Sequence, residues 1–167
     1  QADQMPILQR LASKWCEQNE FIDEAIEYAL RADEFERVAQ LIDKYVVTIW
    51  PHTDHTRFRR WLERLPNEVI NTHPRLCILL ALHLIQIGYI DDAEQRLQIA
   101  ENLLEDSNSP RVPSFQESDL TILRGRAAVI HAMLASYRED LQECIEFATQ
   151  ALKFLPKIDN IWRSLAY

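Results

Sequence analysis

The stretch Phe21-Ile22-Asp23-Glu24-Ala25 returns 68 residues later as Tyr89-Ile90-Asp91-Asp92-Ala93. Each copy follows a segment in which apolar residues recur at helical spacing, and each opens another such segment after a short break. The alanine is small enough to let a paired helix approach closely, and the aromatic residue closes the turn between the two helices. This recurrence predicts pairs of antiparallel helices that repeat along the chain.

The repeat length indicates the kind of array. The separation of 68 residues is twice the tetratricopeptide-repeat period of about 34 residues. A third, weaker copy at 137–144, with Cys144 at the small position, is out of register, and Arg59 stands one period after Ala25. The sequence therefore predicts an all-α fold, a right-handed superhelix of antiparallel helical hairpins. This degenerate tetratricopeptide-like solenoid is expected to form a single domain over residues 1–167.

Proline and glycine separate the expected helices. Nine helices are expected, at about 5–18, 22–30, 35–50, 58–65, 74–87, 90–104, 118–136, 141–155 and from 159 onward. Pro74 suits the first turn of its helix, and Gly88 is expected to end the same helix in a left-handed conformation. The longest loop is expected at about 105–118, where serine, asparagine and proline gather.

Charge and hydropathy argue against two classes of partner. The formal net charge of −8 is unfavourable for direct nucleic-acid contact, because phosphate contacts need an excess of lysine and arginine. The longest apolar run covers 12 residues, 76–87, and a membrane-spanning helix needs about 20. No secretory signal opens the chain, so we expect no membrane contact. Cys16, Cys77 and Cys144 are expected to be buried free thiols, which indicates a reducing, cytoplasmic setting.

A catalytic or metal site is not expected. His52-Thr53-Asp54-His55 has a spacing close to that of metal ligands, but it reads more simply as a polar loop that caps the following helix. No cluster of nucleophile, base and acid is evident elsewhere in the sequence. We therefore expect a protein that is not an enzyme and holds no metal in this segment.

Binding is the function that remains. Stacked helical hairpins form a concave groove lined by the first helix of each pair, here about 5–18, 74–87 and 118–136. The groove would hold a small-molecule inducer, or a protein or peptide. The candidate groove residues are the polar members of these helices: Lys14, Gln18, His83, Gln86, Arg124, Arg126 and His131.

One dense basic cluster stands out. Arg57, Arg60 and Arg64 share a helix face opposite the apolar residues of the same helix, among them Trp61. This face is interpreted first as the solvated side of an amphipathic helix. The alternative is a docking patch for an acidic surface.

Five stretches resemble, in order and spacing, the helical-repeat segment of MalT-like, LuxR-family ATP-dependent transcriptional regulators. They are Trp15-Cys16-Glu17-Gln18-Asn19 with residues 24–39, Arg60-Trp61-Leu62-Glu63-Arg64-Leu65-Pro66, Pro74-Arg75-Leu76, Gly88-Tyr89-Ile90-Asp91-Asp92-Ala93-Glu94, and Asn160-Ile161-Trp162-Arg163-Ser164-Leu165-Ala166. In that family a signalling ATPase precedes a helical-repeat sensor, and a C-terminal helix-turn-helix binds DNA.

The resemblance implies that the chain is the N-terminal part of the sensor superhelix, excised from a longer protein. Its partners would be an inducer and the ATPase domain of the same protein, which the arginine patch would contact. The phosphate-binding motif G-x-x-x-x-G-K-[ST] does not occur, so ATP is expected on a separate domain and no cofactor on this segment. The alternative is a stand-alone tetratricopeptide-like adaptor or chaperone that binds a peptide.

Overall fold

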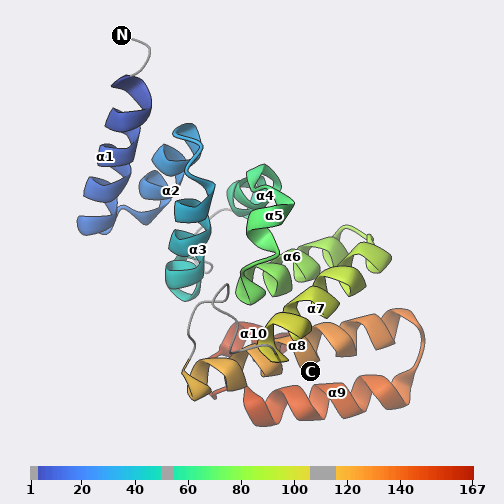
Figure 1. Cartoon of the computed structure of the whole chain (residues 1–167). Coiled ribbons are helices and arrows are strands. Elements are labelled where there is room, and N and C mark those ends of the chain that lie inside the picture. Colours follow the sequence, from blue (N-terminus) through green and yellow to red (C-terminus); the bar gives the residue numbers. More distant parts are fainter. Residues whose placement is uncertain (1–3, 50–54, 106–115) are drawn as a thin grey trace. The chain divides into compact units, whose positions relative to one another are not determined.

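The computed structural model describes residues 4–49, 55–105 and 116–167, and all regular structure within these ranges is helical (Figure 1). The described residues form ten helices: α1 (Met5–Gln18), α2 (Ile22–Arg31), α3 (Phe35–Ile49), α4 (His55–Arg64), α5 (Asn67–Ile70), α6 (Pro74–Gln86), α7 (Ile90–Glu105), α8 (Glu117–Tyr137), α9 (Leu141–Phe154) and α10 (Asn160–Leu165). The all-α prediction is confirmed. Most of the loop expected at 105–118 lies outside the described residues.

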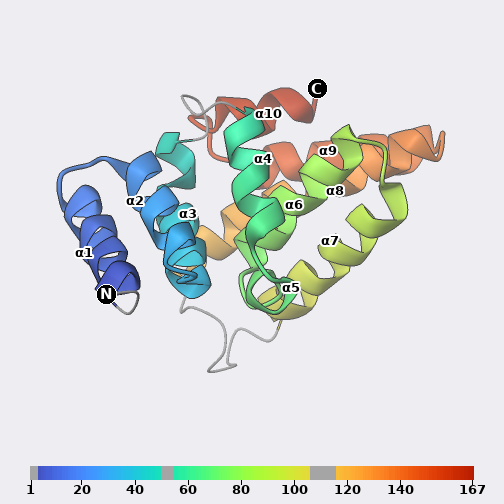
Figure 2. The ribbon, with the colours of Figure 1, turned by 90° about the horizontal axis from the view of Figure 1, so that it is seen from above.

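The helices group into two compact units, Gln1–Ile70 and Asn71–Tyr167. In the first unit α2 packs against α1 and α3, and in the second α6 pairs with α7 and α8 with α9. Helix α8 also contacts α6, α7 and α10, and it runs alongside α9 in both views (Figure 1 and Figure 2). Consecutive helices therefore form hairpins, while the right-handed superhelix and the single domain stay predictions.

Four hairpin turns share one backbone geometry. Each contains one residue with positive φ: Glu20 (65°), Asp33 (54°), Gly88 (86°) and Glu139 (60°). The N–H of the next residue donates to a carbonyl five positions back, in the pairs Phe21–Cys16, Glu34–Ala29, Tyr89–Leu84 and Asp140–Ala135, at 2.9 or 3.0 Å. This is the Schellman arrangement, which satisfies carbonyl groups at a helix end. The left-handed conformation predicted for Gly88 is confirmed.

The repeated motif lies at two of these turns. Ala25 and Ala93 are fully buried, as expected for a close approach of paired helices. The Ser13 hydroxyl donates to the carbonyl oxygen of Ala25 at 2.8 Å and so ties α1 to α2. The Phe21 ring stacks on Trp15 with 6.1 Å between centroids. The repeated motif therefore combines an aromatic residue at the turn with a small alanine at the place where the paired helices pack closely.

The end of the first unit differs from the prediction. Helix α4 begins at His55 rather than near residue 58, and the short helix α5 was not expected. Pro66 ends α4, because its ring cannot continue a helix. Its carbonyl nevertheless accepts hydrogen bonds from the N–H groups of Val69 and Ile70 (3.0 and 3.1 Å), which begins one further turn.

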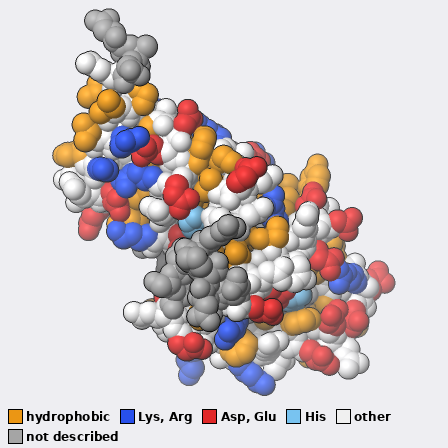
Figure 3. Space-filling view, in the orientation of Figure 1, with side chains coloured by type: hydrophobic (Ala, Val, Ile, Leu, Met, Phe, Trp, Pro, Cys, Tyr) orange, Lys and Arg blue, Asp and Glu red, His pale blue; other side chains and the backbone are white. Residues whose placement is uncertain are grey.

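The apolar surface of α1 is less buried than its helical pattern suggests. On α1 the side chains of Ile7, Leu8, Leu11 and Trp15 are more than half exposed, and Figure 3 shows hydrophobic atoms gathered over this helix. Helix α1 instead buries Ser13 and Cys16.

The cysteines follow the prediction in part. All three are free, and Cys16 and Cys77 are buried. Cys144 is only half-buried, which corrects the expectation of three buried thiols, because the α9 surface around it is open and Ile145 beside it is 65% exposed. Helix α6, which carries Cys77, is buried on nearly every side. None of the described helices combines the length and apolar character needed to cross a membrane.

Candidate ligand-binding site

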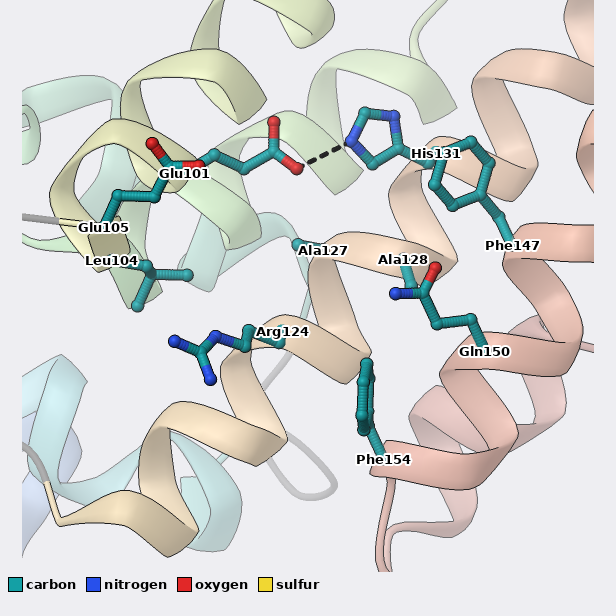
Figure 4. A pocket seen from close by; sticks show the side chains of 10 residues that line it. All are labelled: Glu101, Leu104, Glu105, Arg124, Ala127, Ala128, His131, Phe147, Gln150 and Phe154. Atoms are coloured by element: carbon teal, nitrogen blue, oxygen red, sulfur yellow. Dashed lines mark hydrogen bonds and ion pairs between the residues drawn. The ribbon is translucent and has the colours of Figure 1, made fainter.

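Three helices of the second unit enclose a hollow of about 220 Å³. We call it the α7–α8–α9 hollow. Figure 4 shows the side chains that line it: Glu101, Leu104 and Glu105 from α7, Arg124, Ala127, Ala128 and His131 from α8, and Phe147, Gln150 and Phe154 from α9.

Helical spacing brings these side chains to one place. On each helix the further lining residues lie three, four or seven positions after the first one, and such residues share a face of an α-helix. Helix α8 lies between the other two and forms the floor, because it contacts both α7 and α9. The hollow therefore forms where one face of each of the three helices α7, α8 and α9 lines the same space.

The floor and the walls are apolar. Ala127 and Ala128 are buried, and their small side chains leave the space that forms the hollow. Leu104 closes the α7 side, while the half-buried rings of Phe147 and Phe154 close the α9 side (Figure 4). An apolar surface of a ligand would be shielded from water here, and this burial favours binding.

His131 links all three helices at one end of the hollow. Its Nε2 lies 2.7 Å from Oε1 of Glu101 on α7. Its ring also stacks on Phe147 of α9, with 4.5 Å between centroids and 14° between the planes. His131 therefore has a packing role and a polar role together, and it fixes the position of the Glu101 carboxylate.

Other polar groups of the hollow are little engaged. Arg124 is half exposed, and its nearest acidic partner is Glu117 at 3.9 Å. Within the described part of the chain, Glu105 and Gln150 make no side-chain hydrogen bond or ion pair. These groups are available to a ligand.

The structure brings together two of the seven predicted groove residues, Arg124 and His131. The other five do not line this hollow. Lys14 and Gln18 are exposed on α1, while His83 is half-buried and Gln86 exposed on α6.

Arg126 has a different role from the one predicted. It is 6% exposed and donates two hydrogen bonds to Oδ2 of Asp159, at 2.9 and 3.2 Å. Its guanidinium carbon also lies 5.4 Å from the centre of the Trp162 ring. Arg126 therefore holds the segment around α10 against α8.

Sequence reasoning missed the contributions of α7 and α9. It assigned the groove to the first helix of each pair, whereas six of the ten residues that line this hollow belong to the second helices, α7 and α9. The signal that would have found them is the spacing of Glu101, Leu104 and Glu105, and of Phe147, Gln150 and Phe154, on single helix faces.

The predicted arginine patch contacts helix α2. Arg57 pairs with Asp23 at 2.9 Å, Arg60 with Glu27 at 2.6 Å, and Arg64 donates to the carbonyl of Leu30 at 3.1 Å. In each of these three contacts the two residues lie 33 or 34 positions apart along the chain. This separation matches the tetratricopeptide-repeat length of about 34 residues, although the motif of residues 21–25 does not recur at that distance. The docking of these arginines to another acidic surface stays a prediction.

Glu27 lies at the centre of this contact. Trp61, fully buried as its apolar helix face predicts, donates from Nε1 to Glu27 at 2.8 Å. Partial burial acts to raise the pKa of Glu27, but hydrogen bonds from Trp61 and Arg60 outweigh it and lower the pKa below its ordinary value.

The possible metal ligands at 52–55 cannot be placed. Residues 52–54 lie outside the described residues, and only the backbone of His55 is described. Among the side chains that the structure does describe, no group of three His, Cys, Asp or Glu residues is arranged to hold a metal ion.

No protein-family model, curated protein or solved structure matches the chain. The resemblance to MalT-like regulators therefore stays a prediction from the sequence.

Proposed function

We propose that the chain is a non-catalytic, signal-sensing and protein-interaction segment of a MalT-like, LuxR-family transcriptional regulator. The observation that carries the proposal is the α7–α8–α9 hollow, which joins an apolar floor to polar side chains at its rim. Sites for small ligands commonly have this composition, with a few polar groups that orient the ligand.

The position of the hollow suggests how a signal would act. A ligand there touches three helices at once, so it stabilises the arrangement of α7, α8 and α9 that fits it best. In an array of stacked hairpins each pair packs on its neighbours, and a changed packing passes along the array. The proposed receiver is the ATPase domain of the same protein.

The arginine patch is the proposed contact with that domain. Arg57 and Arg60 keep 47% and 59% of their side-chain surface exposed while they pair with α2. A guanidinium group has five N–H donors in a planar fork, so one carboxylate does not use all of them. An acidic surface on the ATPase domain would bind the remaining donors.

The coding sequence on either side of this chain tests the proposal. A phosphate-binding G-x-x-x-x-G-K-[ST] motif upstream and a helix-turn-helix downstream would support the regulator. A reading frame that ends at Tyr167 would contradict it and favour the stand-alone adaptor.

A further inference from the structure

On the basis of the binding function proposed above, we propose that the α7–α8–α9 hollow binds a small organic cation, an ammonium group carried on an apolar or aromatic body. The hollow of about 220 Å³ is smaller than the roughly 300–1,000 Å³ of pockets for drug-sized ligands. A phenyl ring with a short aminoalkyl chain represents this class.

The charges of the lining favour a cation. Glu101 and Glu105 stand one helical turn apart on α7, and Figure 4 shows both carboxylates on the α7 side of the hollow. Arg124 is the one permanent cation of the lining, and Glu117 lies beside it. The two carboxylates and the one guanidinium of the lining sum to one net negative charge, so a bound anion would meet net repulsion.

The two carboxylates differ in the hydrogen bonds that they already make. His131 holds Glu101 through Oε1 and leaves its second oxygen available. Glu105 pairs with no described residue and is exposed. An ammonium group has three N–H donors and can donate to both carboxylates at once.

The apolar part of the ligand would lie on the floor. Ala127 and Ala128 leave room for a flat group, and Leu104 and Phe154 stand on either side of it (Figure 4). One face of Phe147 is covered by the His131 ring. The face of Phe154 carries negative potential, and aromatic faces attract ammonium groups. Shape and charge therefore favour the same class of ligand.

The test compares three probes of similar size: 2-phenylethylammonium, the neutral 2-phenylethanol and the anion 3-phenylpropionate. Each is titrated into the whole chain while the amide NMR signals of Ala127, Ala128 and Phe147 are followed. We expect the cation to shift these signals and to bind about tenfold or more tightly than the other two, and added salt to weaken this preference.

Variants locate the charge that matters. Glu105→Gln is expected to weaken binding of 2-phenylethylammonium about three- to tenfold. Glu146→Gln changes the net charge equally on the exposed surface of α9 outside the hollow, and it should leave the affinity unchanged. Arg124→Gln should strengthen binding of the cation, because it removes a repelling charge.

Two outcomes would overturn the inference. Preferred binding of 3-phenylpropionate, lost in Arg124→Gln, would show that the hollow takes anions; the proposed binding function would then stand with another ligand class. The absence of any shift at the hollow with all three probes would show that it holds no such ligand. The neighbouring coding sequence still decides the regulator proposal in either case.

Discussion

A glycine closes one of the four Schellman turns, and larger residues close the other three. Gly88, with φ of 86°, has the conformation that L side chains adopt at a cost. Glu20, Asp33 and Glu139 adopt it nonetheless, because two backbone hydrogen bonds hold each of these turns. The N–H of the residue itself donates to the carbonyl three positions back, and the N–H of the next residue donates to the carbonyl five positions back. Of these four residues only the glycine predicts a helix end from the sequence. The sequence therefore does not show that the other three turns have the same geometry.

Gly88→Ala is expected to lower the free energy of unfolding by about 1 kcal/mol. The new Cβ would meet no atom within 4 Å, so the loss would come from the backbone conformation alone. Urea unfolding followed by circular dichroism measures it. The matched variant Glu139→Gly relieves the same strain in another turn and should not destabilise the protein. Equal destabilisation by both variants would argue against a shared left-handed turn.

The three thiols should differ in reactivity. The thiolate is the reactive form, and burial raises the pKa of Cys77 to about 12, so only about one molecule in ten thousand is ionised there at pH 8. Burial and the nearby Glu24 charge raise the pKa of Cys16 as well. We expect Ellman's reagent to modify half-buried Cys144 first and the other two only on unfolding.

Cys144→Ser provides the control for this experiment. It should remove the fast phase and leave the slow phases unchanged. Three equal rates in the native protein would contradict the burial of Cys16 and Cys77.

At the scale of elements, the contact between α2 and α4 depends on the charge of Glu27. Because its pKa is lowered in the folded protein, its ionised form stabilises the fold at neutral pH. This stabilisation is present above the ordinary value of 4.5 and is lost as the pH falls through the lowered folded value.

Glu27→Gln should therefore reduce the fall in stability between pH 7 and pH 3. Urea midpoints at the two pH values measure the effect. The control Glu63→Gln removes a carboxylate whose side chain is 56% exposed, and it should leave the pH dependence as in the parent protein. A pH dependence that is identical in Glu27→Gln and the parent would contradict the role of Glu27.

The helices were easier to predict than the faces they present. Proline, glycine and apolar spacing placed nine of the ten helices, since these signals are local. Apolar spacing alone does not say which side of a helix meets a partner, and on α1 the apolar side chains of Leu8 and Trp15 are exposed. The same limit hid Glu101 and Phe147 from the predicted groove, because their meeting with His131 depends on how three helices pack.

At the scale of the whole molecule, stacked hairpins divide a binding groove among successive helices. The α7–α8–α9 hollow shows this on a small scale, since each of three helices supplies part of its lining. A sensor superhelix of the kind that the resemblance implies would add further hairpins to the groove. Residues 1–167 would then hold only some of the contacts to the natural signal.

We therefore expect residues 1–167 to bind the natural signal at least about tenfold more weakly than the complete sensor, while remaining folded. The reason is that each lost charge-assisted hydrogen bond removes about 1.5–3 kcal/mol, or roughly one to two decades of affinity. Calorimetric titration of one candidate inducer against both proteins measures the difference, with circular dichroism as the check on folding. Equal affinities would place the whole signal site within residues 1–167, and the α7–α8–α9 hollow would then have to hold the signal without further hairpins.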